Sequence, residues 1–271
     1  MLKRLIRYDM KDVSKIAIPL FLASGIISIF CCGVLYFTFG FADEINSVFN
    51  AILLTGGLYF VGIATIAVMI GIVAFTVILR YYRSVFSDEG YLYMVIPVTK
   101  RQFLNSKIIS SVIWVLGCSL VAGACVVVAV ILPTLLYDTS LISEAFDAIF
   151  SELSERGGST GFLVTSLLAD FLVSLLNIAK DVMLVITAIT VGCVYFKRFR
   201  ILISLALYFG ITLFEEAFVA AVKVIVIEVV SSRVWIALVL NSILEILLMA
   251  LIFTAAYLYT LFSLEKKLNL E

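Results

Sequence analysis

Five ionisable residues lie inside long apolar stretches of this chain, where they could form ion pairs or carry a polar substrate. Lys180 and Asp181 are neighbours in one stretch, Glu215 and Glu216 are neighbours in the next, and Glu245 lies near the middle of the last. A charge in an apolar environment is costly, so each of these groups needs a partner or a function. We therefore expect Lys180 to pair with Glu215 or Glu216. Glu245 could instead be held as the neutral acid.

These charges should lie at similar heights along two neighbouring helices. A helix rises about 1.5 Å per residue, which puts Lys180 and Asp181 about 24 Å from Lys197, and Glu215 about 21 Å from Ile201. The pair would form either a structural clasp between the helices or part of a polar path for a substrate. If the fifth apolar run ends early, the carboxylates reach the outer water instead.

Several other chemistries are excluded by what the chain lacks. It contains no His, which rules out His-based zinc sites, Ser-His-Asp triads and imidazole proton relays within this chain. No Gly-Lys dipeptide occurs, so there is no P-loop to wrap nucleotide phosphates. We therefore expect no catalytic residues, no bound cofactor and no metal site.

The chain contains five cysteines, which lack the paired spacing of a metal or redox motif. We interpret them as small packing residues: Cys31, Cys32, Cys118, Cys125 and Cys193.

The composition is that of an integral membrane protein. Hydrophobic residues make up 63% of the 271 residues and charged residues 14%, whereas soluble domains average about 45–50% and about 25%. The mean hydropathy of +1.20 leaves too little polar surface to cover a soluble globule of this size. The formal net charge is zero and no basic stripe is present, so nucleic acid is not an expected partner.

Six apolar runs are long enough to cross a bilayer as helices, which takes about 20 residues. The runs are continuously apolar rather than alternating, which argues against spanning strands. We therefore predict an all-α integral membrane protein with a single domain, 1–271. Its six transmembrane helices are expected at about 16–41, 51–79, 109–137, 172–196, 201–225 and 234–262.

The distribution of Lys and Arg predicts that both termini face the cytoplasm. Five of these residues precede the first run, five follow the second, three separate the fourth from the fifth, and two follow the sixth. The opposite loops hold only Arg156 and Arg233. Cytoplasmic loops of multi-pass proteins carry this excess of positive charge.

Two amphipathic segments are predicted outside the apolar runs. In residues 2–13, apolar residues and Asp9 recur at helical spacing, with basic residues on the remaining face. This pattern is typical of an elbow helix lying in the cytoplasmic interface, with a solvated tail as the alternative. On the opposite side, residues 141–154 have a similar apolar stripe and predict a short extracellular helix that ends at Gly157.

The cytoplasmic connection 80–108 is the longest on its side and is predicted to contain a short helix. Gly90 permits a turn, Pro97 ends the apolar stretch 91–96, and Thr99 caps the next helix. An apolar face just below the bilayer is either an interaction site or a segment lying back among the headgroups, which aromatic residues also favour.

A resemblance to a known family rests on three motifs in the twenty residues from Asp88 to Lys107. They are Asp88-Glu89-Gly90-Tyr91-Leu92, Pro97-Val98 and Ser106-Lys107. Together with the basic N-terminal segment and the six runs, they resemble membrane subunits of the type-2 class of ABC transporters, the permeases of bacterial ABC exporters. In that family, the loop between the second and third spans carries a coupling helix that docks on a separate ATPase. The resemblance implies ATPase-coupling roles for Asp88, Glu89, Gly90, Tyr91, Leu92 and Pro97.

The implied function is that of the transmembrane subunit of an ATP-driven exporter in a bacterial cytoplasmic membrane. ABC ATPase subunits would bind ATP and Mg, because this chain has no P-loop. A second permease copy or a homologous permease would complete the path for a peptide, lipid or drug-like substrate. The alternative is an ion-coupled secondary transporter that uses the intramembrane carboxylates, although such carriers usually show two matching halves with broken helices. A membrane-embedded enzyme would have only carboxylates to work with.

Small residues four positions apart predict close contact between helices. Ala67 and Gly71 have this spacing in the second run, and Ser119 and Gly123 have it in the third. These pairs could form a seam inside the chain or a face for a second permease.

Overall fold

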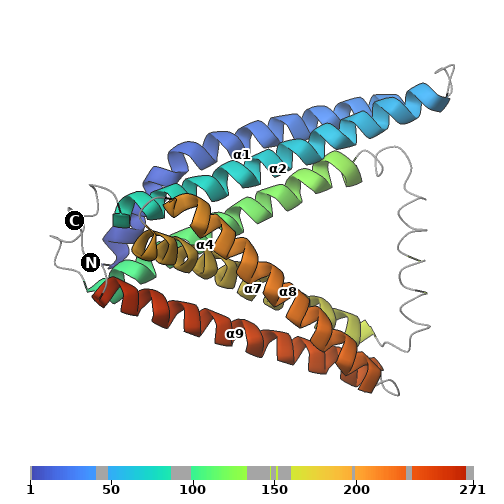
Figure 1. Ribbon diagram of the computed structural model, residues 1–271. Helices are drawn as coiled ribbons and strands as arrows, with labels where there is room; N and C mark the ends of the chain where they lie inside the picture. Colours follow the sequence, from blue (N-terminus) through green and yellow to red (C-terminus); the bar gives the residue numbers. More distant parts are fainter. Residues whose placement is uncertain are drawn as a thin grey trace. The chain divides into compact units, whose positions relative to one another are not determined.

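The chain is helical in nearly all of the residues that the structure, a computed structural model, describes: 2–40, 48–86, 99–132, 147, 151, 160–196, 199–229 and 234–266. Among these residues, six long helices follow one another along the chain (Figure 1): α1 (Leu2–Gly40), α2 (Val48–Phe86), α4 (Lys100–Val126), α7 (Thr160–Tyr195), α8 (Arg200–Val229) and α9 (Val234–Lys266). A π-helical segment, η1 (Val127–Ile131), continues α4.

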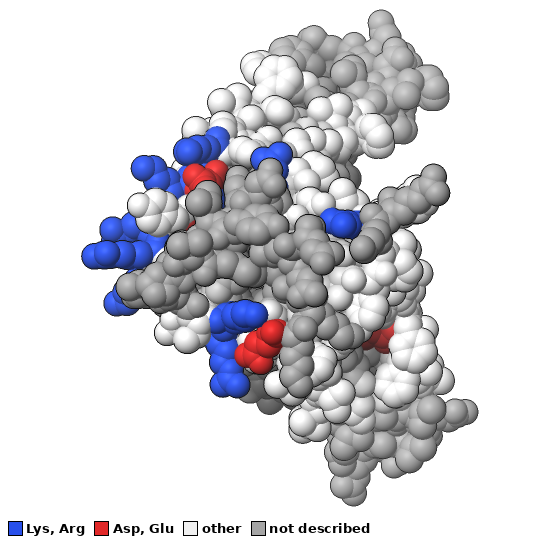
Figure 2. Space-filling model, turned by 60° about the vertical axis from the view of Figure 1, so that its left-hand side comes forward, with Lys and Arg blue, Asp and Glu red and all other residues white. Residues whose placement is uncertain are grey.

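Each of these six helices contains a segment long and apolar enough to cross a membrane. The mean hydropathy of the segments lies between 1.7 and 2.6. Figure 2 shows correspondingly broad areas of uncharged surface among the described residues. The prediction of an all-helical chain with six helices that fit a membrane is therefore confirmed. The segments are Lys3–Phe37, Tyr59–Phe86, Lys100–Ala129, Phe171–Tyr195, Arg200–Val222 and Ser242–Glu265.

Several helices begin before the predicted apolar runs, because the polar residues that flank a run continue its helical hydrogen bonding. At 39 residues each, α1 and α2 are about 58 Å long, against a hydrocarbon thickness of about 30 Å. α4 begins at Lys100, well before the predicted start of its run at residue 109. Thr99 caps it as predicted, because the backbone N–H of Gln102 donates to Thr99 Oγ1 at 3.4 Å.

The N-terminal segment 2–13 is helical and continuous with the rest of α1. Its basic residues are exposed, whereas Asp9 and Val13 are buried. The position of this segment at a membrane interface stays a prediction. The predicted extracellular helix 141–154 lies outside the described residues except for positions 147 and 151.

Contacts divide the chain into two compact units, and α1, α2 and α4 each contribute residues to both. Each unit is described here by itself. Unit 1 comprises Met1–Asp9, Val77–Ile113 and Thr165–Glu271, and unit 2 comprises Met10–Thr76 and Trp114–Val164.

A seam of small side chains joins α1 to α4 in unit 2. The thiol of Cys125 lies 3.8 Å from Ser24 Oγ, and the rings of Phe21 and Trp114 have centroids 6.2 Å apart. Small side chains allow two helices to pack closely, because little side-chain volume lies between their backbones. The cysteines act here as packing residues, as predicted. The small buried residues on these elements are Ala17, Ser24, Ser28, Cys31 and Cys32 on α1, Cys118, Ala122 and Cys125 on α4, and Ala129 on η1.

The predicted small-residue pairs do not form this seam. Ser119 and Gly123 are exposed, and a Cβ atom added at Gly71 or Gly123 would contact no described atom within 4 Å. The buried register on α4 is shifted by one residue, to Cys118 and its helical neighbours. Of the two alternatives for Ser119 and Gly123, the seam inside the chain is therefore not formed in the described part of unit 2, and a face for a second permease stays a prediction.

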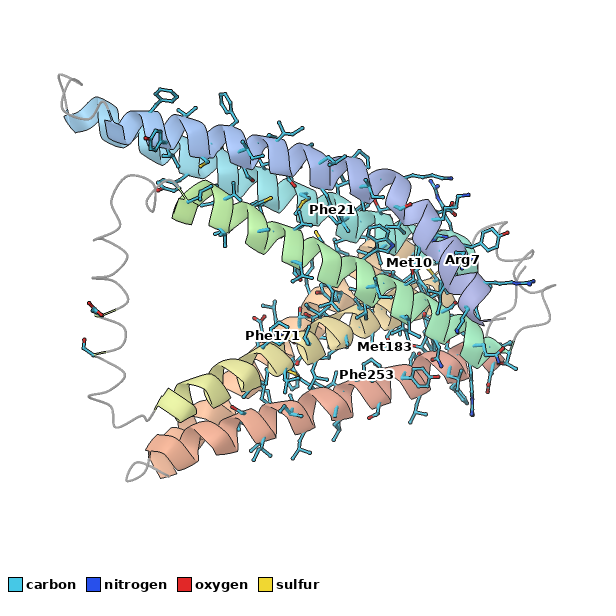
Figure 3. All side chains as sticks on the ribbon, turned by 180° about the vertical axis from the view of Figure 1, so that it is seen from behind. Arg7, Met10, Phe21, Phe171, Met183 and Phe253 are labelled. Carbon is cyan, nitrogen blue, oxygen red and sulfur yellow. The ribbon has the colours of Figure 1, made fainter. Side chains whose placement is uncertain are left out.

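Helix α7 forms the centre of unit 1. Tyr81 on α2 and Thr190 share a hydrogen bond of 2.9 Å between their hydroxyl groups, and Thr187 and Thr260 on α9 share one of 3.0 Å. The side chain of Met183, labelled on α7 in Figure 3, has no exposed surface. Hydroxyl pairs of this kind satisfy polar groups that would otherwise be buried without partners.

Helices α7 and α8 lie close together at Gly192. A Cβ atom built there would lie 2.9 Å from the carbonyl oxygen of Arg200 and 3.1 Å from the Cβ atom of Ser204, and it would overlap Ser204 Oγ. The carbonyl oxygen belongs to the first turn of α8, which cannot move without displacing the start of the helix. Only glycine fits at this position.

Replacing this glycine with the smallest side chain should therefore weaken unit 1. We expect Gly192→Ala to destabilise the chain by about 1–3 kcal/mol, because overpacking forces the backbone apart. Gly210→Ala is the matched control, because a Cβ atom there would contact no described atom within 4 Å. Alanine favours a helix over glycine by about 1 kcal/mol, so the control should be neutral or stabilising. Thermal unfolding in detergent measures both, and equal midpoints would contradict the close approach.

Candidate functional site

The five charges predicted within the apolar runs line one cavity in unit 1. This cavity, which we call the charged cavity, has a volume of about 600 Å³. Lys180 and Asp181 reach it from α7, Glu215 and Glu216 from α8, and Glu245 from α9. A cavity of this size is within the range of about 300–1,000 Å³ that holds drug-sized ligands.

Lys180 is the centre of the charged wall. Its Nζ atom donates to Glu215 Oε1 at 2.6 Å and lies 3.3 Å from Asp181 Oδ1. The side chains of Lys180 and Glu215 are 8% and 7% exposed, whereas that of Asp181 is 43% exposed. The pair between Lys180 and Glu215 is one of the two that the sequence predicts. Burial removes the screening by water, which makes this contact stronger and its loss more costly.

Apolar and aromatic side chains complete the cavity. Tyr208, Phe209 and Leu213 from α8 and Met249 from α9 are among the lining residues. Phe209 and Leu213 are exposed, so this wall continues to the surface of unit 1. The cavity combines carboxylates with apolar side chains, which suits a ligand that has both a charged and an apolar part.

A second ionic cluster ties together three helix ends in unit 1. Asp9 Oδ1 accepts hydrogen bonds from Arg80 Nη2 at 2.8 Å, Arg80 Nε at 3.1 Å and Lys107 Nζ at 2.8 Å. Asp9 and Lys107 are almost completely buried. We call Asp9, Arg80 and Lys107 the Asp9 cluster. It joins the start of α1 to the last turns of α2 and the first turns of α4.

Two further contacts attach α4 to α9 near the Asp9 cluster. Lys100 Nζ donates to the carbonyl oxygen of Leu264 at 2.6 Å, and Tyr257 OH donates to Asn105 Oδ1 at 3.0 Å. A cation near the end of a helix interacts favourably with the unsatisfied carbonyl groups of its last turn. The first two turns of α4 are thus bonded to α1 and α9, and through Asp9 they are linked to α2.

The ATPase-coupling residues implied by the family resemblance lie outside the described residues, which stop at 86 and resume at 99. They are Asp88, Glu89, Gly90, Tyr91, Leu92 and Pro97. The last motif of the resemblance, Ser106-Lys107, is described. Both residues are buried, and Lys107 belongs to the Asp9 cluster.

Sequence reasoning missed the Asp9 cluster. The signal was a carboxylate in an otherwise apolar stripe, since Asp9 falls at helical spacing with Leu5, Ile6 and Val13. An acidic residue on that face needs a cation, and Lys107 is flanked by apolar residues and serines. In the described residues, no group of three or more His, Cys, Asp or Glu residues could hold a metal ion.

Comparisons with known proteins leave the family of this chain open. No protein-family model matches the chain, and neither a curated protein nor a solved structure matches it. The resemblance to type-2 ABC permeases therefore stays a prediction.

Proposed function

We propose that this chain is the transmembrane subunit of an ATP-driven exporter of the type-2 ABC class. It would work in a bacterial cytoplasmic membrane with a second permease and with separate ABC ATPase subunits that bind ATP and Mg. The proposed cargo is a peptide, lipid or drug-like molecule. Segment 87–98 is the proposed docking site for the ATPase.

The Asp9 cluster is the observation that carries this proposal. Arg80 lies at the end of α2, which leads into segment 87–98, and Lys107 lies at the start of α4, which leads out of it. Both cations bind the same carboxylate oxygen. A force on the segment would therefore move the ends of α2 and α4 as one body, together with the start of α1.

Bonded contacts extend from this body toward the charged cavity. Tyr81 on α2 bonds Thr190 on α7, and Lys100 on α4 bonds the end of α9. Helices α7 and α9 both contribute cavity residues. A movement driven by the ATPase would therefore be transmitted along α7 and α9 to Lys180 and Glu245. Coupling of ATP hydrolysis to transport requires such transmission.

Co-purification tests the proposed partner. An ABC ATPase expressed without a tag from the adjacent gene should be retained by the tagged chain. We expect Gly90→Pro and Tyr91→Asp to reduce the retained ATPase at least tenfold, because the first breaks the predicted turn and the second puts a charge on the predicted apolar face.

Tyr8→Asp is the matched control for that experiment. Tyr8 is a 70% exposed aromatic residue at the start of α1, outside segment 87–98. The same change of side chain there should leave the retained ATPase unchanged. Loss of the ATPase from all three variants, or from none, would contradict docking at the segment.

An ion-coupled secondary transporter is the second candidate. It is favoured by the four carboxyl groups that line one cavity, Asp181, Glu215, Glu216 and Glu245. Transport in proteoliposomes distinguishes the two functions. Export that requires the ATPase and ATP supports the first proposal, whereas export driven by an ion gradient without any ATPase supports the second.

A further inference from the structure

The described residues that line the charged cavity include more carboxyl groups than Lys180 can neutralise. Among the described residues that line it, four are acidic and one, Lys180, is basic. Lys180 is already held between Glu215 and Asp181, at 2.6 Å and 3.3 Å. Glu216 adds a further carboxyl group to the same space, so that Asp181, Glu215 and Glu216 face one lysine. A bound cation would offset this excess negative charge, whereas a bound anion would be repelled by it.

Two buried acceptor atoms on the cavity wall lack a donor. Glu215 Oε2 and Asn177 Oδ1 are buried and have no hydrogen-bond partner among the described residues. Glu215 is 93% buried, and both residues line the cavity. Buried acceptors without donors are costly in an apolar environment. A ligand with N–H groups in the cavity would supply the missing donors, while Glu215 Oε1 keeps its bond to Lys180.

The other lining residues determine the chemistry of the part of the ligand that is not charged. Phe209, Leu213 and Met249 offer apolar surface, and Phe209 and Leu213 continue it to the outside of unit 1. In a membrane this surface would meet acyl chains. An alkyl or aryl group lying along it would stay out of water while the cation reached the carboxylates.

We propose that this cavity binds an amphiphile whose polar end is a primary ammonium or guanidinium group. The carboxylates select the positive charge, and the two acceptor atoms select a cation that has N–H groups to donate. A quaternary ammonium has the charge but no donor, so it fits less well. The proposal deepens the proposed function by naming the class of exported substrate, and for transport it rests on that function.

Binding of n-octylammonium to the purified full chain tests this inference without any ATPase. The chain is placed in phosphatidylcholine nanodiscs, and the heat of titration is corrected with empty nanodiscs. We expect n-octylammonium to bind at least tenfold more tightly than n-octyltrimethylammonium, which has the same charge and chain length. Octyl sulfate should show no binding beyond that of empty nanodiscs.

Two variants locate the binding. Glu216→Gln should weaken n-octylammonium binding at least threefold, and because Glu216 is exposed in the structure the variant should fold normally, which its melting temperature checks. Glu265→Gln, an exposed carboxylate on α9 outside the cavity lining, should leave the affinity unchanged. Equal affinities for the two cations, equal binding by wild type and Glu216→Gln, or binding of sodium ions in place of the amphiphile would each overturn the inference.

The outcomes separate this inference from the proposed function. Binding with the expected preference, but no ATP-driven export, would overturn the proposed function alone. ATP-driven export by a chain that does not bind n-octylammonium would overturn the assignment of the cavity alone.

Discussion

Lys180→Glu should abolish both the stable fold of unit 1 and export. The substitution removes the basic residue of the charged cavity and puts a new carboxylate beside Glu215 and Asp181. Breaking a buried ion pair by removing one partner costs about 3–5 kcal/mol, and repulsion between the carboxylates adds to this. We expect little monodisperse protein in size-exclusion chromatography, and no export from the fraction that folds.

A charge swap separates loss of the pair from loss of the lysine itself. The double variant Lys180→Glu with Glu215→Lys restores opposite charges across the 2.6 Å contact between α7 and α8. It should recover most of the monodisperse yield that the single variant loses. If Lys180→Glu alone folds and exports like the wild type, the pair is neither a structural clasp nor part of a substrate path.

Asp9→Asn should produce the second large effect. Asp9 Oδ1 is the shared acceptor for Arg80 and Lys107, so the variant leaves two cations of a largely buried cluster without that carboxylate. We expect a loss of about 3 kcal/mol in the free energy of unfolding, the lower end of the cost of breaking a buried pair. Thermal unfolding in detergent measures it. Because the cluster ties the helices on both sides of segment 87–98, ATP-driven export should also fall while the ATPase remains bound.

Asp12→Asn provides the matched control on the same helix. Asp12 pairs with Lys15 at 3.3 Å, and both side chains are exposed, by 60% and 68%. Pairs of this kind contribute about 0–1 kcal/mol. The control should therefore melt within about 2 °C of the wild type, the shift that about 1 kcal/mol produces in a chain of this size. Equal melting temperatures for the two variants would show that the Asp9 cluster does not hold unit 1 together.

The helices and one ion pair could be predicted from the sequence because both follow from simple physical rules. Continuous apolar runs identify helices that fit a bilayer whatever their packing. The heights of Lys180 and Glu215 follow from the rise of a helix, and a buried charge requires a partner. Those two rules predict that Lys180 pairs with Glu215 or Glu216, and the structure shows the pair with Glu215.

The packing faces could not be predicted in the same way. Small residues occur on more than one face of α4, and the sequence does not say which face is buried. The spacing of Ser119 and Gly123 favours close contact, whereas the structure buries Cys118 and Ala122. The spacing puts Asp9 in the apolar stripe of segment 2–13, which is predicted to face the acyl chains. Its partners Arg80 and Lys107 are about 70 and 100 residues away in the chain, and only the fold brings them together.

Photo-cross-linking from position 91 tests the central claim most directly. Tyr91 is replaced by the photoreactive residue p-benzoylphenylalanine, which keeps an aromatic side chain, and cells that express the full chain with its neighbouring ATPase are irradiated. The same residue is placed at Phe60, a 73% exposed apolar position on α2, as the control. We predict that the chain labelled at position 91 cross-links to the P-loop ATPase, and that the chain labelled at position 60 does not. Cross-links from position 91 to lipid alone would contradict the account of this chain as an ATPase-driven exporter subunit.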